Sequence, residues 1–217
     1  MEFKLEWDKT GERFYEAGVD RGVLYPFKSG KYQAGVVWNG LTAVNENPSG
    51  AEDNALYADN IKYLNIKSIE EFAGGIECFT YPDEWAACDG SAQLAPGVSI
   101  SQQKRSMFGL SYRTKIGNDE EDELGYKIHL VYGCSASVAS KDHQTVNENP
   151  EAMTFNYEFT TTPVKVDGFR PTAHLTVDST KCDATKLAEF EKKIYGFGED
   201  EPTLLMPDEV AKIFAQG

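Results

Sequence analysis

The feature that most constrains this chain is a pair of alternating segments joined by an acidic link, between Met107 and Gly133. In the first segment, every second position belongs to one row: Phe108, Leu110, Tyr112, Thr114 and Ile116. The second segment has a matching row: Tyr126, Ile128, Leu130 and Tyr132. Because successive side chains of a strand point to opposite faces, this period of two predicts two strands closed into a hairpin.

The link of this hairpin, residues 117–125, contains five consecutive acids: Asp119, Glu120, Glu121, Asp122 and Glu123. Such a block cannot be buried and has no apolar face to dock, so we expect it to project into solvent or toward a partner. Its carboxylates suit a hard cation, but the block lacks the spaced ligands and inner glycine of a calcium loop. We therefore interpret it as a solvated charge block and expect no metal there.

Other segments predict a mainly β chain. Alternation predicts strands at residues 34–44, 61–67, 76–81 and 152–162. Asp183 predicts the N-cap of a flanking α-helix at about 184–195, and the capping-box pattern from Ser68 predicts a short helix near 68–73. We predict an antiparallel β-sandwich or β-barrel with these two helices.

The length of 217 residues suits a single all-β domain, and a hydrophobic content of 41% can supply its core. We assign residues 1–196 to this domain. Residues 197–217 are acidic and loop-like, with Pro207 suited to open a short helix, and we assign them to a C-terminal extension.

The charge of the chain limits its partners. Lys and Arg number 21 against 35 Asp and Glu, which gives −14. This balance disfavours gripping nucleic-acid phosphates or docking on anionic membranes. No apolar run approaches the roughly 20 residues that span a bilayer. The N-terminal MEFKLEWDK lacks the apolar region of a signal peptide, so we expect synthesis in a cytoplasm without export by a cleaved signal.

The familiar signatures of catalysis are missing from the sequence. It contains no Gly-rich phosphate loop, GxSxG elbow, HExxH or EF-hand pattern. Its histidines, His129, His143 and His174, are scattered, and we interpret the first and last as solvated or hydrogen-bonded sheet residues. We expect no enzyme activity, no catalytic residue, no metal and no cofactor.

Two alternatives remain open at this point. Trp7, Trp38 and Trp85 could form a sugar-stacking platform of a carbohydrate-binding β-sandwich, although large aromatic residues on strands more often belong to the core. An acid pair of a small hydrolase also remains open, because the geometry of such a pair is three-dimensional.

Several segments carry a family resemblance. They are LYADNIKYLNI, YPDEWAACDGSAQLAPGVSISQQKRSMFGLSYRTKIGN, GYKIHLVYG and PEAMTFNYEFTTTPVKV. Together they resemble the major tail proteins, or tail tube proteins, of long-tailed bacteriophages and prophages of Gram-positive hosts. The similarity spans most of the chain, from about Trp7 to the helix at 184–195.

The resemblance implies a β-sandwich subunit of the virion. Six copies would close a ring, with their hairpins paired edge to edge into an inner barrel, and rings would stack into a tube. The tube would enclose a tape-measure protein, meet tail-terminator and initiator proteins, and conduct DNA without binding it specifically. Assembly would take place in the bacterial host cytoplasm, with no membrane partner and no catalytic residues.

The resemblance also assigns roles to two sets of residues. The hairpin 106–133 would form the tube wall, with Phe108, Leu110, Tyr112, Tyr126, Ile128, Leu130 and Tyr132 as its residues. The loops 45–60 and 117–125 would be subunit contacts, through Asn45, Glu46, Asn47, Pro48, Glu52, Asp53, Tyr57, Asp59 and the acids at 119–123. Long polar loops in compact domains are usually functional or ordered by a partner, which agrees with this role.

Two physical arguments point the same way. The edges of a long hairpin promote aggregation unless they are paired, and ring closure would pair them. A conduit for DNA should not grip it, and an acidic chain repels phosphates. We therefore predict a self-assembling structural protein.

Overall fold

The structure is a computed structural model that describes residues 4–145 and 152–215. It is mainly β, as predicted. Its strands are β1 (Tyr15–Lys28), β2 (Lys31–Tyr32), β3 (Val36–Trp38), β4 (Leu41–Glu46), β5 (Asp53–Ala58), β6 (Ile61–Lys67), β7 (Ala73–Cys78), β8 (Ala92–Ala95), β9 (Val98–Ile100), β10 (Phe108–Gly117), β11 (Gly125–Ala136), β12 (Phe155–Thr161) and β13 (His174–Asp178). Its helices are the 3₁₀ turn η1 (Asp83–Trp85), α1 (Ala86–Asp89), α2 (Ala184–Tyr195) and α3 (Pro207–Ala215).

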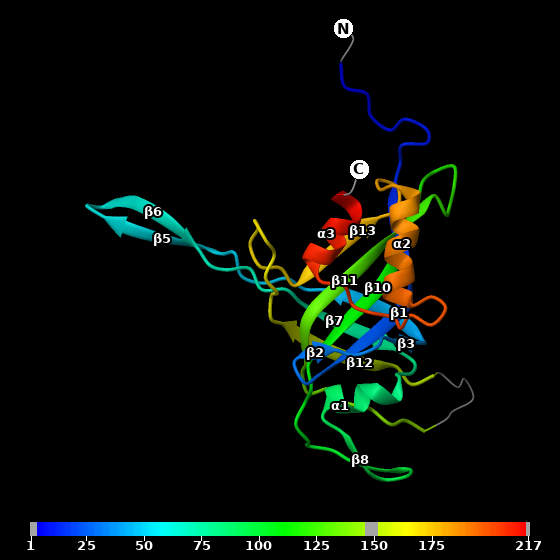
Figure 1. The fold of residues 1–217 in the computed structure, drawn as a ribbon. Coiled ribbons are helices and arrows are strands. Elements are labelled where there is room, and N and C mark those ends of the chain that lie inside the picture. Colours follow the sequence, from blue (N-terminus) through cyan, green and yellow to red (C-terminus); the bar gives the residue numbers. More distant parts are fainter. Residues whose placement is uncertain (1–3, 146–151, 216–217) are drawn as a thin grey trace.

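The predicted hairpin, β10 and β11, lies at the centre of the main antiparallel sheet (Figure 1). The strand order is β2-β1-β10-β11-β12-β7-β4, with β13 also paired to β11 and β3 to β1. The outer edge of β10 is occupied by β1, and that of β11 by β12 and β13. The prediction that this hairpin has unpaired edges is therefore wrong, because distant segments of the same chain pair with both of its strands.

The sheet divides at Gly133. On one side of this residue β11 pairs with β13 over residues 127–131, and on the other it pairs with β12 over residues 134–136. Gly133 has a φ of +60°, and its carbonyl accepts a hydrogen bond from Thr162 N at 2.9 Å. The strands β12, β7 and β4 thereby form a second layer of a β-sandwich. Over residues 4–145 and 152–215, the strand order runs from β2 to β4 without closing into a barrel.

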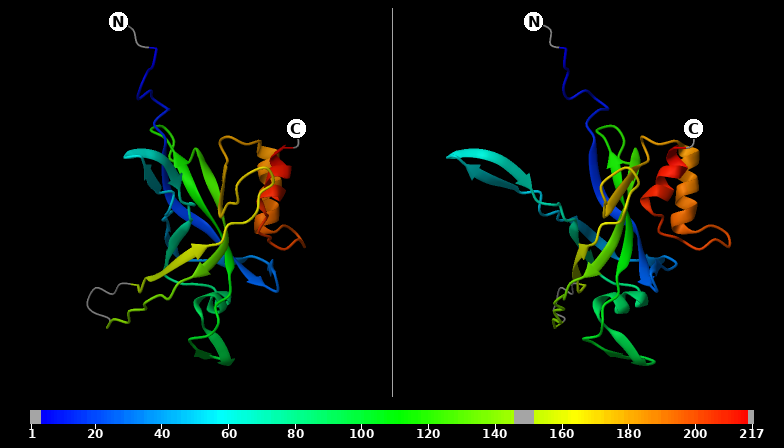
Figure 2. Two further views of the ribbon diagram at one scale, coloured as in Figure 1. Left: turned by 90° about the vertical axis from the view of Figure 1, so that its left-hand side faces the viewer. Right: turned by 60° about the vertical axis from the view of Figure 1, so that its left-hand side comes forward.

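The central hairpin is buried on both faces. One core cluster lies between the sheet layers and includes Phe108, Leu110 and Tyr112 of β10 with Tyr157 and Phe159 of β12. The other lies under the helices and contains these side chains of β11, α2 and α3: Ile128, Leu130, Tyr132, Leu187, Phe190, Ile194, Val210 and Ile213. Figure 2 shows both helices on the same side of the sheet.

The flanking helix α2 has the predicted bounds. The Asp183 carboxylate accepts hydrogen bonds from Thr185 N at 2.9 Å and Lys186 N at 3.0 Å, and so satisfies two free backbone donors at the helix start. The predicted helix near 68–73 is wrong. Ser68 Oγ accepts from Glu52 N instead of capping a helix, and β7 begins at Ala73.

The segment assigned to a C-terminal extension packs on the main sheet. Leu204 and Leu205 are buried in the same cluster as α2, and the Tyr132 hydroxyl donates to Leu205 O at 2.9 Å. A helix does begin at Pro207, as predicted. The described part of this segment therefore shares a core with the sheet.

A hairpin formed by β5 and β6 extends away from the sandwich (Figures 1 and 2). We call residues 49–71 the arm, because its first and last residues, Ser49 and Glu71, form a β-bridge at its root. The prediction of a long loop over 45–60 is wrong in part, since Asn45 and Glu46 end β4 and residues 53–58 form β5. The predicted strand 61–67 supplies the partner of β5.

Candidate assembly surfaces

The arm exposes large apolar side chains that the sandwich does not cover. They are Leu56, Tyr57, Ile61, Tyr63, Leu64, Ile66 and Ile69, with exposed fractions from 39% to 84%. Leu56 pairs with Leu64 on one face of the hairpin, and its neighbour Tyr57, which pairs with Lys62, lies on the other, so both faces are partly apolar. A two-stranded hairpin is marginally stable alone in water. The arm is therefore suited to contact another surface.

The outer part of the arm is electrically neutral, although the whole arm carries −3 because three further acids, Glu52, Glu70 and Glu71, lie near its root. Residues 53–67 contain two acids, Asp53 and Asp59, and two lysines, Lys62 and Lys67, so their charges cancel while the whole chain carries −14. One of these pairs, Lys67 Nζ and Asp53 Oδ1, is 3.8 Å apart. Residues 53–67 can thus approach another acidic molecule with little repulsion of their own.

The predicted contact residues of the 45–60 segment all lie at the arm or its root, and all are exposed. Asn45 and Glu46 end β4, Asn47 and Pro48 follow, Glu52 precedes β5, Asp53 and Tyr57 belong to β5, and Asp59 lies in the turn to β6. Their exposure agrees with a contact role, which remains a prediction.

The acidic link, residues 117–125, projects as predicted, with exposed side chains at 119–123, but several of its acids are engaged within the chain. Asp119 accepts from Gly11 N at 3.0 Å, and one of its oxygens lies 3.6 Å from Arg13. Lys115 forms an ion pair with Glu123. Part of the like-charge repulsion within the link is therefore offset by basic residues of the same chain.

The acidic link and the arm do not converge. In Figure 1 the arm extends to the left, while the green loop between β10 and β11 lies at the upper right. The two predicted contact segments would therefore meet different surfaces of a partner.

The predicted wall residues are interior side chains of the subunit. Phe108, Leu110, Tyr112, Ile128, Leu130 and Tyr132 are at most 2% exposed. Tyr126 is half-buried, and its hydroxyl donates to Glu191 Oε1 at 2.8 Å. The six buried side chains hold the sandwich together and present no free surface.

The structure does not form the three-tryptophan platform that a sugar-binding module would need. Trp38 and Trp85 are buried with their ring centroids 4.8 Å apart, whereas Trp7 is 69% exposed. The two aromatic side chains in the core cannot stack on a sugar.

One pocket formed by the described residues is lined by two carboxylates, Glu16 and Asp178, and has a volume of about 650 Å³. Asp178 also lines a pocket of about 870 Å³ between β13 and α3. Burial alone would raise the pKa of Asp178, but hydrogen bonds from Thr180 and the nearby Lys181 lower it below its usual value. A general acid needs the opposite shift.

The structure does bring together a polar group that the sequence did not suggest. His129 and His174 lie beside each other and beside Glu46 at the root of the arm, while His143 is exposed outside this group. The sequence left two interpretations of these histidines, solvated or hydrogen-bonded. His129 is buried, and the rings of both His129 and His174 are hydrogen-bonded. No sequence signal links them, because the two histidines are 45 residues apart and meet only through the pairing of β11 with β13.

Comparison with known proteins gives no family. No protein-family model matches the chain, and no curated protein matches it. Across the residues that the structure describes, no helix is long and apolar enough to cross a membrane.

Proposed function

We propose that this chain is a self-assembling tail tube subunit of a long-tailed bacteriophage. Six copies would form a ring, and stacked rings would enclose a tape-measure protein and later conduct DNA. The observation that carries the proposal is the arm, a two-stranded extension with apolar side chains on both faces. The sequence resemblance supports the same conclusion.

A second copy of the chain is the partner that fits the arm best. The hairpin of the arm, residues 53–67, has no net charge, so it can contact an acidic subunit without strong repulsion. Among the described residues, β4 and β13 each pair with one neighbouring strand, so each presents an outer edge to a further strand. Strand addition at such an edge supplies main-chain hydrogen bonds and gives the arm the additional strands that its stability requires.

The charge of the chain supports a passive role toward DNA. A subunit carrying −14 repels phosphates, so DNA can pass a wall of such subunits without being held. The partners proposed here are further copies of the chain, the tape-measure protein, and the terminator and initiator proteins of the tail. The proposed location is the virion, after synthesis in the host cytoplasm.

Assembly of the purified protein tests this function. Sedimentation velocity and negative-stain microscopy over a range of concentrations should show rings or tubes at high concentration. The double variant Ile61→Thr/Tyr63→Thr removes two exposed apolar side chains and keeps residues that favour strands, so it should remain monomeric. Val138→Thr changes a side chain of 84% exposure outside the arm and should assemble normally.

Two outcomes would contradict the proposal. A wild-type protein that stays monomeric at high concentration, even beside tail initiation proteins, would argue against a tube subunit. Normal assembly of the double variant would exclude its arm side chains as the subunit contact.

A further inference from the structure

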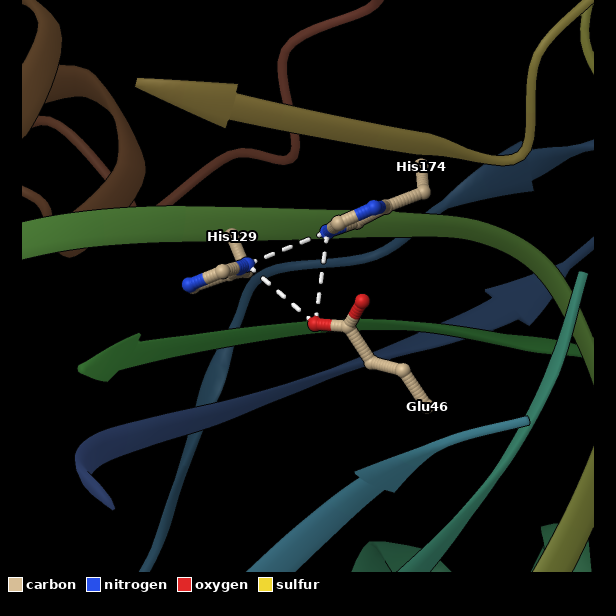
Figure 3. A group of neighbouring side chains, drawn as sticks. All are labelled: Glu46, His129 and His174. Carbon is tan, nitrogen blue, oxygen red and sulfur yellow. Dashed lines mark hydrogen bonds and ion pairs between the residues drawn. The ribbon is translucent and has the colours of Figure 1, made fainter. Parts of the chain in front are cut away.

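Glu46, His129 and His174 come from three strands and converge on one point (Figure 3). Glu46 ends β4, His129 lies within β11, and His174 begins β13. Nδ1 of His129 is 3.1 Å from Nε2 of His174, and Oε1 of Glu46 is 3.5 Å from the first nitrogen and 3.9 Å from the second. Each residue thus offers one ligand atom, and the three atoms lie within 3.9 Å of one another.

These separations suit a metal ion. In a tetrahedral zinc site the Zn–N and Zn–O distances are about 2.0–2.2 Å, which places neighbouring ligand atoms about 3.3–3.5 Å apart. The observed separations lie on both sides of this range, and a small rotation of the exposed Glu46 side chain would shorten the longest one. We propose that Glu46, His129 and His174 bind a divalent transition metal ion, with Zn²⁺ as the ion that fits best.

The surrounding residues orient the proposed ligands. Nε2 of His129 lies 3.0 Å from Thr114 Oγ1, so Nε2 can carry the ring proton and donate it to this hydroxyl. In that tautomer Nδ1 keeps its lone pair for the metal ion. The Tyr112 hydroxyl donates to Oε1 of Glu46 at 2.6 Å. Metal ligands commonly have such outer partners, which set the tautomer and fix the ring orientation.

Aromatic stacking holds the two imidazoles in place. Tyr112 stacks on His129 with centroids 4.6 Å apart and rings within 2° of parallel, and His129 stacks on His174 at 5.3 Å. Phe72 covers the other side of His174 at 4.8 Å. The two histidines are therefore fixed before any ion arrives, which lowers the entropy cost of binding.

The ligand types of the site also suit a metal. Imidazole nitrogens and a carboxylate oxygen are atoms that zinc binds in proteins. Glu46 supplies the negative charge.

A hydrogen-bonded pair is the competing explanation for this cluster. The two facing nitrogens could share one proton, and the Thr176 hydroxyl lies 3.5 Å from Nδ1 of His129 and 3.4 Å from Nε2 of His174. That arrangement would bind no metal, whereas the proposed site takes up one ion per chain. Three protein ligands also leave a coordination position for water, because Glu46 is exposed.

The site lies where the arm joins the sandwich. Glu46 ends β4 three residues before the arm begins at Ser49, and Phe72 is the first residue after the arm. A bound ion would link β4 to β11 and β13 and thereby fix the root of the arm. The metal site does not depend on the proposed function and would stand without it.

Metal titration of the chelator-treated, dialysed full chain tests the site. Calorimetry with ZnCl₂ should show one saturable site. Zn²⁺ at about 100 times its Kd should raise Tm by about 5–10 °C, from the linkage of binding to folding for a chain of this size. Co²⁺ should give the intense visible absorption of a four-coordinate ion.

Variants locate the site. Glu46→Gln and His174→Gln should each weaken Zn²⁺ binding by about 100-fold or more, and Thr114→Val, which removes only an outer partner, by about 10–100-fold. The controls are His143→Gln, which removes an exposed histidine, and Cys182→Ser, which removes a half-buried thiol. Both controls should bind Zn²⁺ like the wild type. Circular dichroism checks that each variant is folded. Because Glu46 is exposed, Glu46→Gln is less disruptive to folding than His174→Gln.

Three results would overturn the proposal. They are a wild-type chain whose Tm does not respond to Zn²⁺, a titration without a saturable site, and binding that is lost in a control but kept in Glu46→Gln. The first two would favour the hydrogen-bonded pair.

Discussion

Gly133→Ala tests the point at which the sheet divides. A Cβ at this position would lie 2.2 Å from Thr162 O and 3.1 Å from its carbonyl carbon and its nitrogen. These are backbone atoms, which cannot move aside as a flexible side chain can. The backbone φ of +60° is also one that residues with a side chain rarely adopt.

The expected cost follows from these two effects. A left-handed backbone costs about 1–2 kcal/mol in a residue other than glycine, and overpacking against fixed atoms adds about 1–3 kcal/mol. We therefore expect Gly133→Ala to lower the free energy of unfolding by about 2–5 kcal/mol. The clash would also separate Thr162 N from Gly133 O, which holds β12 beside β11.

Gly30→Ala is the matched control. Gly30 has a φ of +82°, and a Cβ there would meet nothing within 4 Å, so this variant reports the backbone effect without the clash. Equilibrium urea unfolding of the wild type and both variants should show Gly133→Ala as less stable than Gly30→Ala by about 1–3 kcal/mol. Equal destabilisation by the two variants would refute the clash and with it this description of the dividing point.

Two further predictions concern single side chains. Arg113 donates to both Asp20 oxygens at 2.7 Å and lowers the pKa of Asp20 despite partial burial, so Asp20→Asn should cost about 0.5–1 kcal/mol at neutral pH after solvent screening. Because the pKa of Asp20 is lowered on folding, this contribution is present above the unfolded pKa of about 3.9 and is lost as pH falls through the folded pKa. Urea unfolding from pH 6 to pH 2, with Asp142→Asn as the control, should show that the stability difference between the wild type and Asp20→Asn vanishes in acid. A difference that stays constant with pH would contradict this prediction. Asp183→Ala should lower the free energy of unfolding by about 1 kcal/mol through loss of the α2 cap, whereas Asp183→Asn should keep most of this stability. Equal losses of stability in the two variants, measured by thermal unfolding, would rule out capping as the cause.

Local patterns in the sequence predicted the central hairpin and the helix α2 well. Both depend on interactions between residues close in the chain. Alternation at period two marks a strand, and a capping aspartate followed by a 3.6-residue apolar stripe marks a helix. The same kind of pattern failed at Ser68, where the hydroxyl accepts from Glu52 across the arm instead of capping a helix.

Pairing between distant segments was decided by the tertiary structure. Residues 53–58 lack clear alternation, yet they form β5 because residues 61–67 pair with them. The alternating rows of β10 and β11 belong to opposite faces of the sheet, because Tyr112 lies opposite His129 and Ser111 opposite Leu130. Register of this kind depends on every neighbouring strand and cannot be read from one segment.

The proposed metal site depends wholly on tertiary structure. The sequence determined the residue types, the alternation that places His129 in a strand, and the charge that disfavours a grip on phosphates. It did not place Glu46 beside the two histidines, because that requires β11 to pair with β13 and the second sheet layer to carry β4 across them. A shift of one residue in either pairing would turn a ligand to the opposite face, since side chains alternate along a strand.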